Sequence, residues 1–487
     1  MFKNILSLTF VSFLLTYPLS IEAKDDLKLC WQKQVKPLNE QYLTLTFNEK
    51  INRFEHSFEP WQQTLRVAKG KVWTNSNNFM KFDTMTNTVS KRTYNSKTQL
   101  NEKTLLYLDH GDKDLFEVTK GMFYEKIIET ARYSGTTLID YFYKQKIKPT
   151  KESTKDLAVF QTTINKTIVK LFIRKSDNLL EKITALSDDE LFGDVLSSFV
   201  YTNYSSKNTL FYAKSVAIEK INGKLKDEVN ILDAAINPTA AKLLDEPAGY
   251  TLKEDEAFKP DIKTEKYSTN IHFLELKHTD DRVMIVEFKD FLLVAESPLT
   301  SKNGELIINE AKKIAPNKPI KYFVFGHYHA HYLGGIRPFI HKGATVICSK
   351  EDQPYVSYLA TNPHTLQPDS LQMQPKPLKI SEIKDSMTIS DGVFDMKIYK
   401  IGDKSQHTND YLIYYFPSEK LLFEDDLVWI AKEGEMRKAS GRQAGLYNAL
   451  KDLKLDITTI IQSWPINEMR VKTVIPFSDL EKSMTIK

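Results

Sequence analysis

Three histidines at alternate positions constrain this chain more than any other feature of its sequence. Residues 321–331 read Lys-Tyr-Phe-Val-Phe-Gly-His-Tyr-His-Ala-His. The apolar and aromatic run before the glycine predicts a short buried strand that ends at the glycine. His327, His329 and His331 follow it, so three of the ten histidines of the chain fall within five residues.

Histidines in this arrangement are suited to binding a metal ion. Alternate side chains on an extended backbone point the same way, roughly 6.5–7 Å apart along the chain. Two imidazoles so placed can converge on one ion, and neutral imidazole is the commonest protein metal ligand. A His-x-His pair at a strand end, followed by Gly334 and Gly335, is hard to explain by packing alone. The alternatives are hydrogen-bonded structural histidines and a surface tract without function.

The overall composition is that of an ordinary globular protein. The 487 residues suggest two to four domains, with 41% hydrophobic and 27% charged residues. The 67 basic and 63 acidic residues give a net charge of +4. This near balance argues against a dedicated nucleic-acid binder, which would carry a clustered basic surface.

Residues 1–23 are expected to be a signal peptide. Lys3 supplies a short positive region, residues 5–19 are apolar, and Ala23 is a small residue for cleavage. The apolar run is short of the roughly 20 residues that span a bilayer, and no later segment is long and apolar enough to do so. We expect the mature chain to be exported, periplasmic or secreted, with an uncleaved N-terminal anchor as the alternative. Cys30 and Cys348 could pair there, although the sequence does not show their proximity.

The mature chain is expected to form two domains. Residues 24–245 predict a mostly antiparallel β domain with one helix near 121–144, and turn signals such as Asn222-Gly223 separate its strands. Its histidines, His56 and His110, are isolated. Residues 246–268 predict a linker, with the border near 245.

Residues 269–487 predict a layered α/β sandwich. Apolar runs at 283–288 and 291–295 suggest a hairpin, and an amphipathic helix is expected at 303–313 before the histidine strand. Further strands are expected at 394–401, 411–416 and 420–423, and a helix at 445–453. Strand pairs followed by strand–helix units favour this architecture.

The same region resembles the metallo-β-lactamase fold family at four ordered landmarks. The landmarks are the hairpin with Asp290 and Glu296, the stretch His-Tyr-His-Ala-His-Tyr-Leu-Gly-Gly at 327–335, His407 before a strand, and Leu-Phe-Glu-Asp-Asp at 422–426. The second is similar to the family's His-x-His-x-Asp-His-x-Gly-Gly, and the fourth to its Leu-Phe-x-Gly-Asp. The resemblance implies an αββα sandwich with metals at the edge of its two sheets.

The family's two metal sites are kept to different degrees. By the resemblance, His327, His329 and His407 would hold the first metal ion, and this set is intact. At the second site, His331 replaces an aspartate, Tyr332 replaces a histidine, and Gln462-Ser463-Trp464-Pro465 stands where the last histidine is expected. Of its four protein ligands only Asp426, the bridging aspartate, is kept. One zinc ion is therefore expected, with a degenerate second site.

These residues imply a hydrolase. Three imidazoles and a water form a recognised catalytic zinc arrangement, in which the pKa of the water falls to about 7. Asp426 would position this water, His331 would serve as a nitrogen ligand or general base, and Tyr332 would donate a hydrogen bond to a developing oxyanion. We expect an exported hydrolase of a small-molecule ester, lactone, thioester or amide.

Two alternatives stay open. The loss of three ligand positions favours a pseudoenzyme, in which the fold is kept as a binding or structural module. Redox or iron-based chemistry at the same ligands is the second alternative.

Overall fold

The computed structural model describes residues 22–54, 57–109, 111–237, 248–253, 259–466 and 471–486, with side chains from residue 25. The predicted signal peptide lies outside these residues except for Glu22 and Ala23, which begin the first helix. His56, His110 and the predicted domain border near 245 also lie outside them. Among the described residues, no helix has the length and apolar character that a membrane crossing needs.

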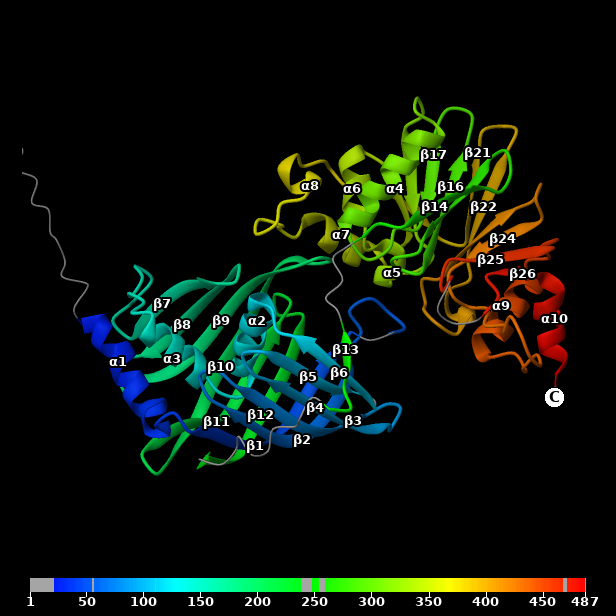
Figure 1. Ribbon diagram of the computed structural model, residues 1–487. Helices are drawn as coiled ribbons and strands as arrows, with labels where there is room; N and C mark the ends of the chain where they lie inside the picture. The colour runs from blue at the N-terminus through cyan, green and yellow to red at the C-terminus, as the bar shows by residue number, and fades with distance from the viewer. Residues whose placement is uncertain are drawn as a thin grey trace, which may run out of the picture.

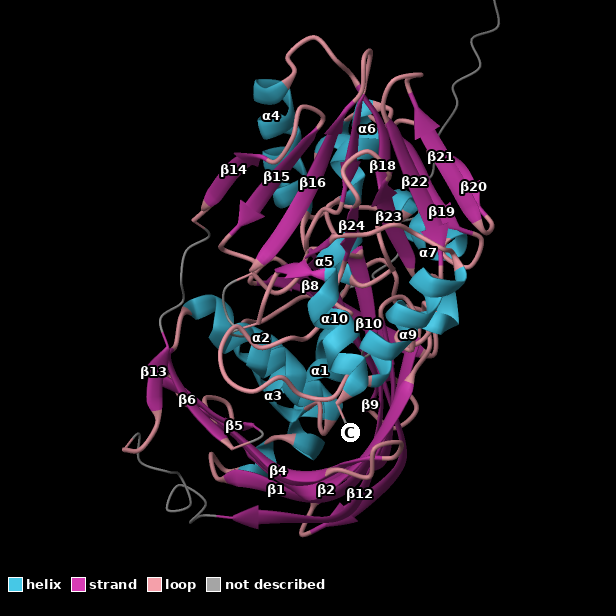
Figure 2. Cartoon of the chain, turned by 90° about the vertical axis from the view of Figure 1, so that its right-hand side faces the viewer, coloured by secondary structure: helices cyan, strands magenta, loops and turns pink. Residues whose placement is uncertain are grey.

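The first domain is one strongly curved sheet that wraps around three helices (Figures 1 and 2). Its strand order is β13-β6-β5-β4-β3-β2-β1-β12-β11-β10-β9-β8-β7, and every pair is antiparallel except β13 with β6. The strands are β1 (Tyr42–Arg53), β2 (Thr64–Thr74), β3 (Phe79–Asn87), β4 (Thr93–Leu100), β5 (Thr104–Asp109), β6 (Asp112–Glu117), β7 (Leu157–Ile164), β8 (Thr167–Arg174), β9 (Leu179–Asp189), β10 (Gly193–Lys207), β11 (Leu210–Lys220), β12 (Leu225–Asn237) and β13 (Thr251–Lys253).

The concave face of this sheet is covered by α1 (Glu22–Gln34), α2 (Lys120–Glu129) and α3 (Thr136–Lys144). Leu138, Ile139 and Phe142 of α3 are fully buried against inward-facing strand residues. The single helix expected at 121–144 is interrupted at 130–135. Gly135 is the N-cap of α3, and a Cβ atom there would overlap the Leu180 side chain of β9.

The second domain is a four-layered αββα sandwich, which confirms the predicted fold class. One sheet has the order β14-β15-β16-β17-β18-β19-β20, and the other β21-β22-β23-β24-β25-β26. The strands are β14 (Ile262–Lys266), β15 (Ile271–Leu276), β16 (Asp281–Glu287), β17 (Leu292–Ala295), β18 (Ile320–Val324), β19 (Thr345–Ser349), β20 (Lys379–Ile383), β21 (Ser386–Ser390), β22 (Asp395–Lys400), β23 (Leu412–Phe416), β24 (Leu421–Glu424), β25 (Thr459–Gln462) and β26 (Val474–Pro476).

Alternation along the strands produces three apolar layers in this domain. Val286 and Phe423 belong to the layer between the two sheets. Ile285 lies on the opposite face, under the helices of the first sheet, and Leu422 lies under the helices of the second. The helices are α4 (Ser301–Ile314), α5 (Ala330–Leu333), α6 (Ile336–Lys342), α7 (Gln353–Thr361), α8 (Ser370–Met373), α9 (Gly441–Asp452) and α10 (Phe477–Thr485).

The segment expected to be a linker contributes a strand to each domain. Strand β13 pairs with β6 of the first sheet, and β14 pairs with β15 of the second domain. Cys30 is buried in the first domain and Cys348 in the second, and neither is in a disulfide.

The two domains meet through an aromatic cluster. Trp61, between β1 and β2, packs against Phe192 of its own domain and against Tyr355 and Tyr358 of α7, with ring centroids 4.8–5.8 Å apart. Beside it, the backbone N–H of Asp194 donates to the carbonyl of Pro363 at 2.7 Å. Apolar side chains of the first domain therefore pack directly against the core of the second domain.

Candidate metal centre

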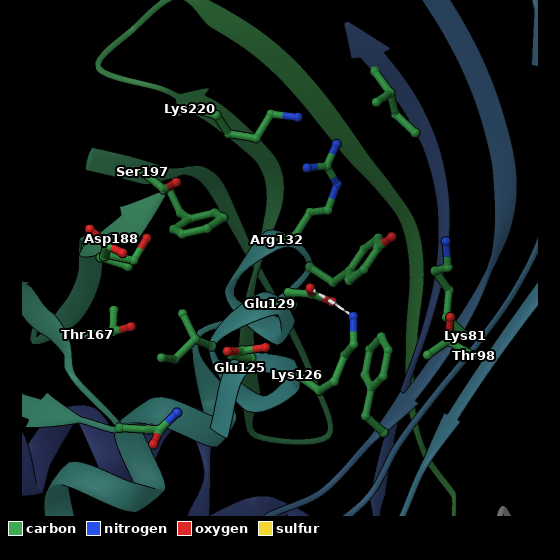
Figure 3. Close-up of a pocket in the computed structure, with 18 of the residues that line it drawn as sticks. Lys81, Thr98, Glu125, Lys126, Glu129, Arg132, Thr167, Asp188, Ser197 and Lys220 are labelled. Atoms are coloured by element: carbon green, nitrogen blue, oxygen red, sulfur yellow. Dashed lines mark hydrogen bonds and ion pairs between the residues drawn. The ribbon is translucent and has the colours of Figure 1, made fainter. Parts of the chain in front are cut away.

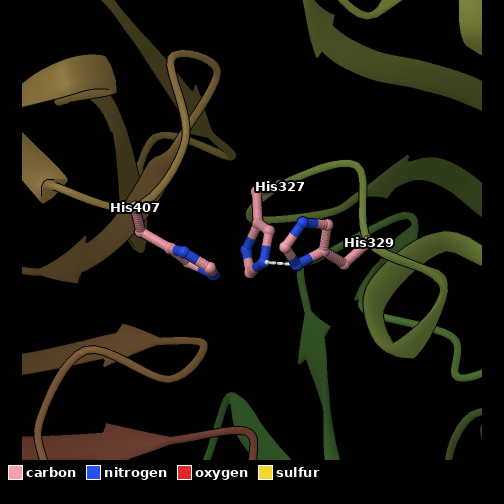
Figure 4. Close-up of side chains that lie close together, drawn as sticks. All are labelled: His327, His329 and His407. Atoms are coloured by element: carbon pink, nitrogen blue, oxygen red, sulfur yellow. Dashed lines mark hydrogen bonds between the residues drawn. The ribbon is translucent and has the colours of Figure 1, made fainter. Parts of the chain in front are cut away.

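Three histidines from two segments converge at one edge of the sandwich (Figure 4). His327 and His329 lie in the loop after β18, and His407 follows the short helix η4 (Gly402–Ser405) just before β23. The backbone N–H of Leu412 donates to the carbonyl of Gly326 at 2.7 Å, which joins the two segments. The interpretation of the alternating histidines as one cluster therefore holds for two of the three, because His331 lies elsewhere.

The ring nitrogens of the three histidines are arranged as ligands of one ion would be. One nitrogen from each ring lies within 4.8 Å of the other two, and Nε2 of His327 is 3.0 Å from Nδ1 of His329. His327 and His407 are buried, and His329 is half-buried. Nitrogen ligands at 2.0–2.1 Å from a tetrahedral zinc ion lie about 3.3 Å from one another. The donor set therefore fits a metal ion of this kind.

A buried carboxyl orients His327 from behind. Nδ1 of His327 lies 2.6 Å from Oδ2 of Asp425, and both side chains are inaccessible to solvent. A proton on Nδ1 is donated to this carboxyl, which leaves Nε2 to face His329. Metal-binding histidines commonly have such a carboxylate partner, since it sets the tautomer and the ring orientation.

Tyr411 holds the acidic segment behind the histidines in place. Its hydroxyl accepts hydrogen bonds from the backbone N–H groups of Asp425 and Asp426 at 3.1 and 3.0 Å, and donates to Glu424 at 3.1 Å. Its ring stacks on His327 with centroids 4.9 Å apart. One side chain thus positions both the imidazole and its carboxyl partner.

Carboxyl groups crowd this edge of the sandwich. Burial, and then the charge of Glu296, raise the pKa of Asp425 well above its usual range. Burial raises the pKa of Glu296 well above its usual range, although Tyr414 and the Gly326 N–H donate to it. Burial also raises the pKa of Glu424 to about 8. A cation at the histidines would lower the cost of ionising these groups.

Asp426 lies beside the histidines. Its Oδ2 is 3.4 Å from Nε2 of His407 and 3.3 Å from Nη1 of Arg442. Burial opposes its ionisation, but His407 and Arg442 together lower its pKa below the usual value. Within the described part of the chain, the group that could hold a metal ion contains the three histidines without Asp426.

His331 and Tyr332 take other positions. Nδ1 of His331 lies 3.0 Å from Oδ1 of Asp281, and its ring faces Trp464. Burial raises the pKa of Asp281 to about 6, and Asp281 raises the pKa of His331 despite the burial of the imidazole. Tyr332 is buried with its ring 4.3 Å from that of His327, and burial raises the pKa of its hydroxyl well above the usual value.

Several residues of the site were missed by the sequence reasoning. These are Asp425, Tyr411, Asp281 and Arg442, with Glu424 as the first of three consecutive acids at 424–426. Three acids directly after an apolar strand are themselves a signal, because a strand end buried on both faces should not carry them without partners.

An open pocket is lined by residues that neighbour His407 and Asp426. It has a volume of about 500 Å³ and is lined by Gln406, Trp429, Ser440, Gly441 and Arg442. Gln406 precedes His407 in the chain, and Arg442 contacts Asp426. A larger cavity of about 840 Å³ lies in the concave face of the first domain, around Arg132 and Lys220 (Figure 3). Both of these cations are paired, since Asp227 lies 2.6 Å from Arg132 and 2.7 Å from Lys220.

Structural comparison finds related folds among solved proteins. A metallo-β-lactamase from Pontibacter korlensis has 17% identity and a TM-score of 0.34, covering 46% of this chain and 98% of its own. The metallo-β-lactamase FIM-1 from Pseudomonas aeruginosa, in its mono-zinc form, has 16% identity and a TM-score of 0.33, covering 46% and 93%. A flavoprotein from Thermotoga maritima has 13% identity and a TM-score of 0.32, covering 47% and 61%.

No family model matches the sequence, and no curated protein does. The architecture of the second domain shows its fold. By its αββα layers, its strand order and the histidine motif at the edge of its two sheets, this domain has the metallo-β-lactamase fold.

Proposed function

We propose that the second domain is a metal-dependent hydrolase with one metal ion, held by His327, His329 and His407. The observation that carries this proposal is the convergence of the three imidazoles within 4.8 Å, with Asp425 oriented behind His327. Zinc fits the three-nitrogen donor set. At such a site it acts as a Lewis acid and lowers the pKa of water to about 7.

The neighbouring side chains have separate tasks in this proposal. Asp425 keeps Nε2 of His327 directed at the metal position. Asp426, whose Oδ2 lies 3.4 Å from Nε2 of His407, accepts a proton from the attacking water. Tyr332 keeps its proton and so can donate a hydrogen bond to a developing oxyanion. His331 with Asp281 lies at the rim, where it can exchange protons with solvent.

We propose a small-molecule ester, lactone, thioester or amide that enters the pocket beside Gln406 and Arg442. We also propose that the chain is exported after cleavage behind Ala23. The mass of the protein purified from its native host tests this cleavage, because the mature chain would begin at Lys24.

A specific observation favours a second candidate, a pseudoenzyme that retains the fold for binding. Where the family's last histidine is expected, Gln462 donates to the Trp464 carbonyl at 3.1 Å and Ser463 to the Arg282 carbonyl at 2.8 Å. Both side chains thus hydrogen-bond to nearby backbone carbonyls. The buried Tyr332 stands at a second position where the family motif has a histidine ligand. Two-metal chemistry is therefore not part of either proposal.

Elemental analysis of the purified chain, beside His329→Ala, tests the proposal. About one metal ion per wild-type chain and none in the variant are expected, together with hydrolysis of at least one member of a chromogenic ester, lactone, thioester and amide panel. Two ions per chain would show that His331 and Asp426 rebuild a second site. A folded protein without metal would support the pseudoenzyme.

A further inference from the structure

We infer that the first domain is part of the metal centre. The turn at residues 57–62, between β1 and β2, contacts both histidine-bearing segments and reinforces the hydrogen bonds that join them directly. As a result, metal binding and docking of the two domains stabilise each other. This inference rests on the proposed metal site, and adds to it a role for the first domain.

Two consecutive carbonyls of this turn bind the two histidine segments. The hydroxyl of Tyr328, which lies between His327 and His329, donates to the Ser57 carbonyl at 2.6 Å. The backbone N–H of Asn409, two residues after His407, donates to the Phe58 carbonyl at 3.0 Å. The side chain of Asn409 also donates to Glu59 at 3.1 Å. One short stretch of the first domain therefore contacts both halves of the site.

Internal hydrogen bonds fix the conformation of the turn. The side-chain carbonyl of Gln62 accepts from the backbone N–H groups of Phe58 and Glu59 at 2.7 and 3.2 Å. The hydroxyl of Ser57 donates to the Gln62 carbonyl at 3.0 Å. Gln62 thus closes the turn without contacting the second domain through any of these bonds.

The turn is also anchored beside the site. Trp61 packs between Phe192 of the first domain and Tyr355 and Tyr358 of the second, and the ammonium group of Lys224 lies 4.6 Å from its ring centroid. The internal hydrogen bonds of the turn and the packing of Trp61 fix the positions of its carbonyl groups. These groups therefore accept hydrogen bonds from Tyr328 and Asn409 without rearrangement of the turn. Displacement of the turn would remove these hydrogen bonds from both segments and leave them joined by the Leu412 bond to Gly326 and by the Tyr328 N–H, which donates to Asp410 at 2.8 Å.

The coupling must act in both directions. If a docked turn raises metal affinity by some factor, bound metal raises the docking equilibrium by the same factor. Couplings of this kind typically amount to 5–150-fold. The metal should therefore slow hydrogen exchange at amides of the first domain, including Phe58 and Glu59, although those residues do not bind it.

Zinc affinity of the full chain, measured by chelator competition, tests the inference. Tyr328→Phe removes the hydroxyl that binds Ser57 and keeps the ring. Gln62→Ala opens the turn from the side of the first domain alone. We expect each variant to bind zinc at least 5-fold more weakly. The matched control is Gln63→Ala, whose side chain donates to the Lys224 carbonyl at 2.8 Å within the first domain, and whose affinity should equal that of the wild type.

Hydrogen exchange with and without zinc supplies the second readout. In the wild type, zinc should slow exchange at the amides of Phe58, Glu59 and Asn409, and Gln62→Ala should abolish that protection. Unchanged zinc affinity in Gln62→Ala, or no zinc-dependent protection in a wild type that binds zinc, would overturn the coupling and leave the metal centre intact. A wild type that binds no zinc would overturn both the coupling and the proposed function.

Discussion

Nδ1 of His327 lies 2.6 Å from Oδ2 of Asp425, and the two buried residues follow strands of different sheets of the sandwich. This bond connects the loop after β18 to the end of β24. It therefore serves both the fold and the proposed metal site, and the two roles can be separated by substitution.

Asp425→Asn should weaken metal binding while preserving the fold. An amide has the shape of the carboxyl group but lacks the negative charge that makes the imidazole a better ligand. Loss of such a carboxylate partner typically costs 10–100-fold in metal affinity. Chelator competition measures the change. The control is Asp456→Asn, an exposed carboxylate paired with Lys420, and equal affinities in the two variants would contradict the assigned role.

Gly326→Ala should destabilise the second domain. A Cβ atom at Gly326 would overlap the carboxyl group of Asp425, which is fixed by its neighbours and cannot move freely. Overpacking of this kind typically costs about 1–3 kcal/mol, so the urea midpoint of unfolding should fall. Gly121→Ala is the matched control, since its Cβ would meet only flexible side chains. A similar loss of stability in that variant would contradict the assigned role of Gly326.

Zinc should stabilise the wild-type chain against heat. At a free concentration about 100 times its dissociation constant, a ligand that binds only the native state adds about 2.7 kcal/mol. Differential scanning calorimetry should show the shift in the wild type and in His341→Ala, whose imidazole lies against the Gln374 carbonyl away from the site. His407→Ala should show none, and a shift of full size in that variant would place the metal elsewhere.

The sequence was most informative where a pattern is local. The histidines at 327 and 329 are close in the chain, and the apolar strand before them sets their direction, so their convergence could be predicted. The carboxyl partner of His327 could not be predicted from the sequence. Asp425 lies 98 positions away in the chain and contacts His327 only when the two sheets pack together. The bond between Tyr414 and Glu296 spans 118 positions in the same way.

His331 is a residue for which the local sequence pattern gave the wrong prediction. Its alternate spacing with His327 and His329 suggested a common direction, but α5 begins at Ala330, and the chain leaves the extended conformation. Its imidazole turns instead to Asp281. In the first domain, turn signals predicted antiparallel hairpins, whereas the parallel pairing of β13 with β6 depends on a contact that local patterns do not encode.

Acid should weaken the contact between the domains through His364. This side chain is 4% exposed and lies beside the junction of Asp194 with residues 363–366. Burial, and then the charge of Arg337, lower the pKa of His364, with Asp369, Asp194 and Asp189 acting in the opposite direction. The unfolded chain therefore binds this proton more readily than the folded chain. The contribution of His364 to the free energy of unfolding is fully present above the pKa of the unfolded chain, about 6.5. It decreases as the pH falls below that value.

The prediction is measured as the difference in urea midpoint between pH 7.5 and pH 5.5. His364→Leu should reduce that difference, because leucine fills the site without binding a proton. His272, whose pKa burial also lowers, contributes equally to both proteins, so comparing them isolates His364. The Asp194 carboxylate, which accepts from the Thr365 and Leu366 N–H groups, has a lowered pKa and loses its contribution only at more acidic pH. An identical pH dependence in the variant would therefore show that His364 is not the group that responds to acid at this interface.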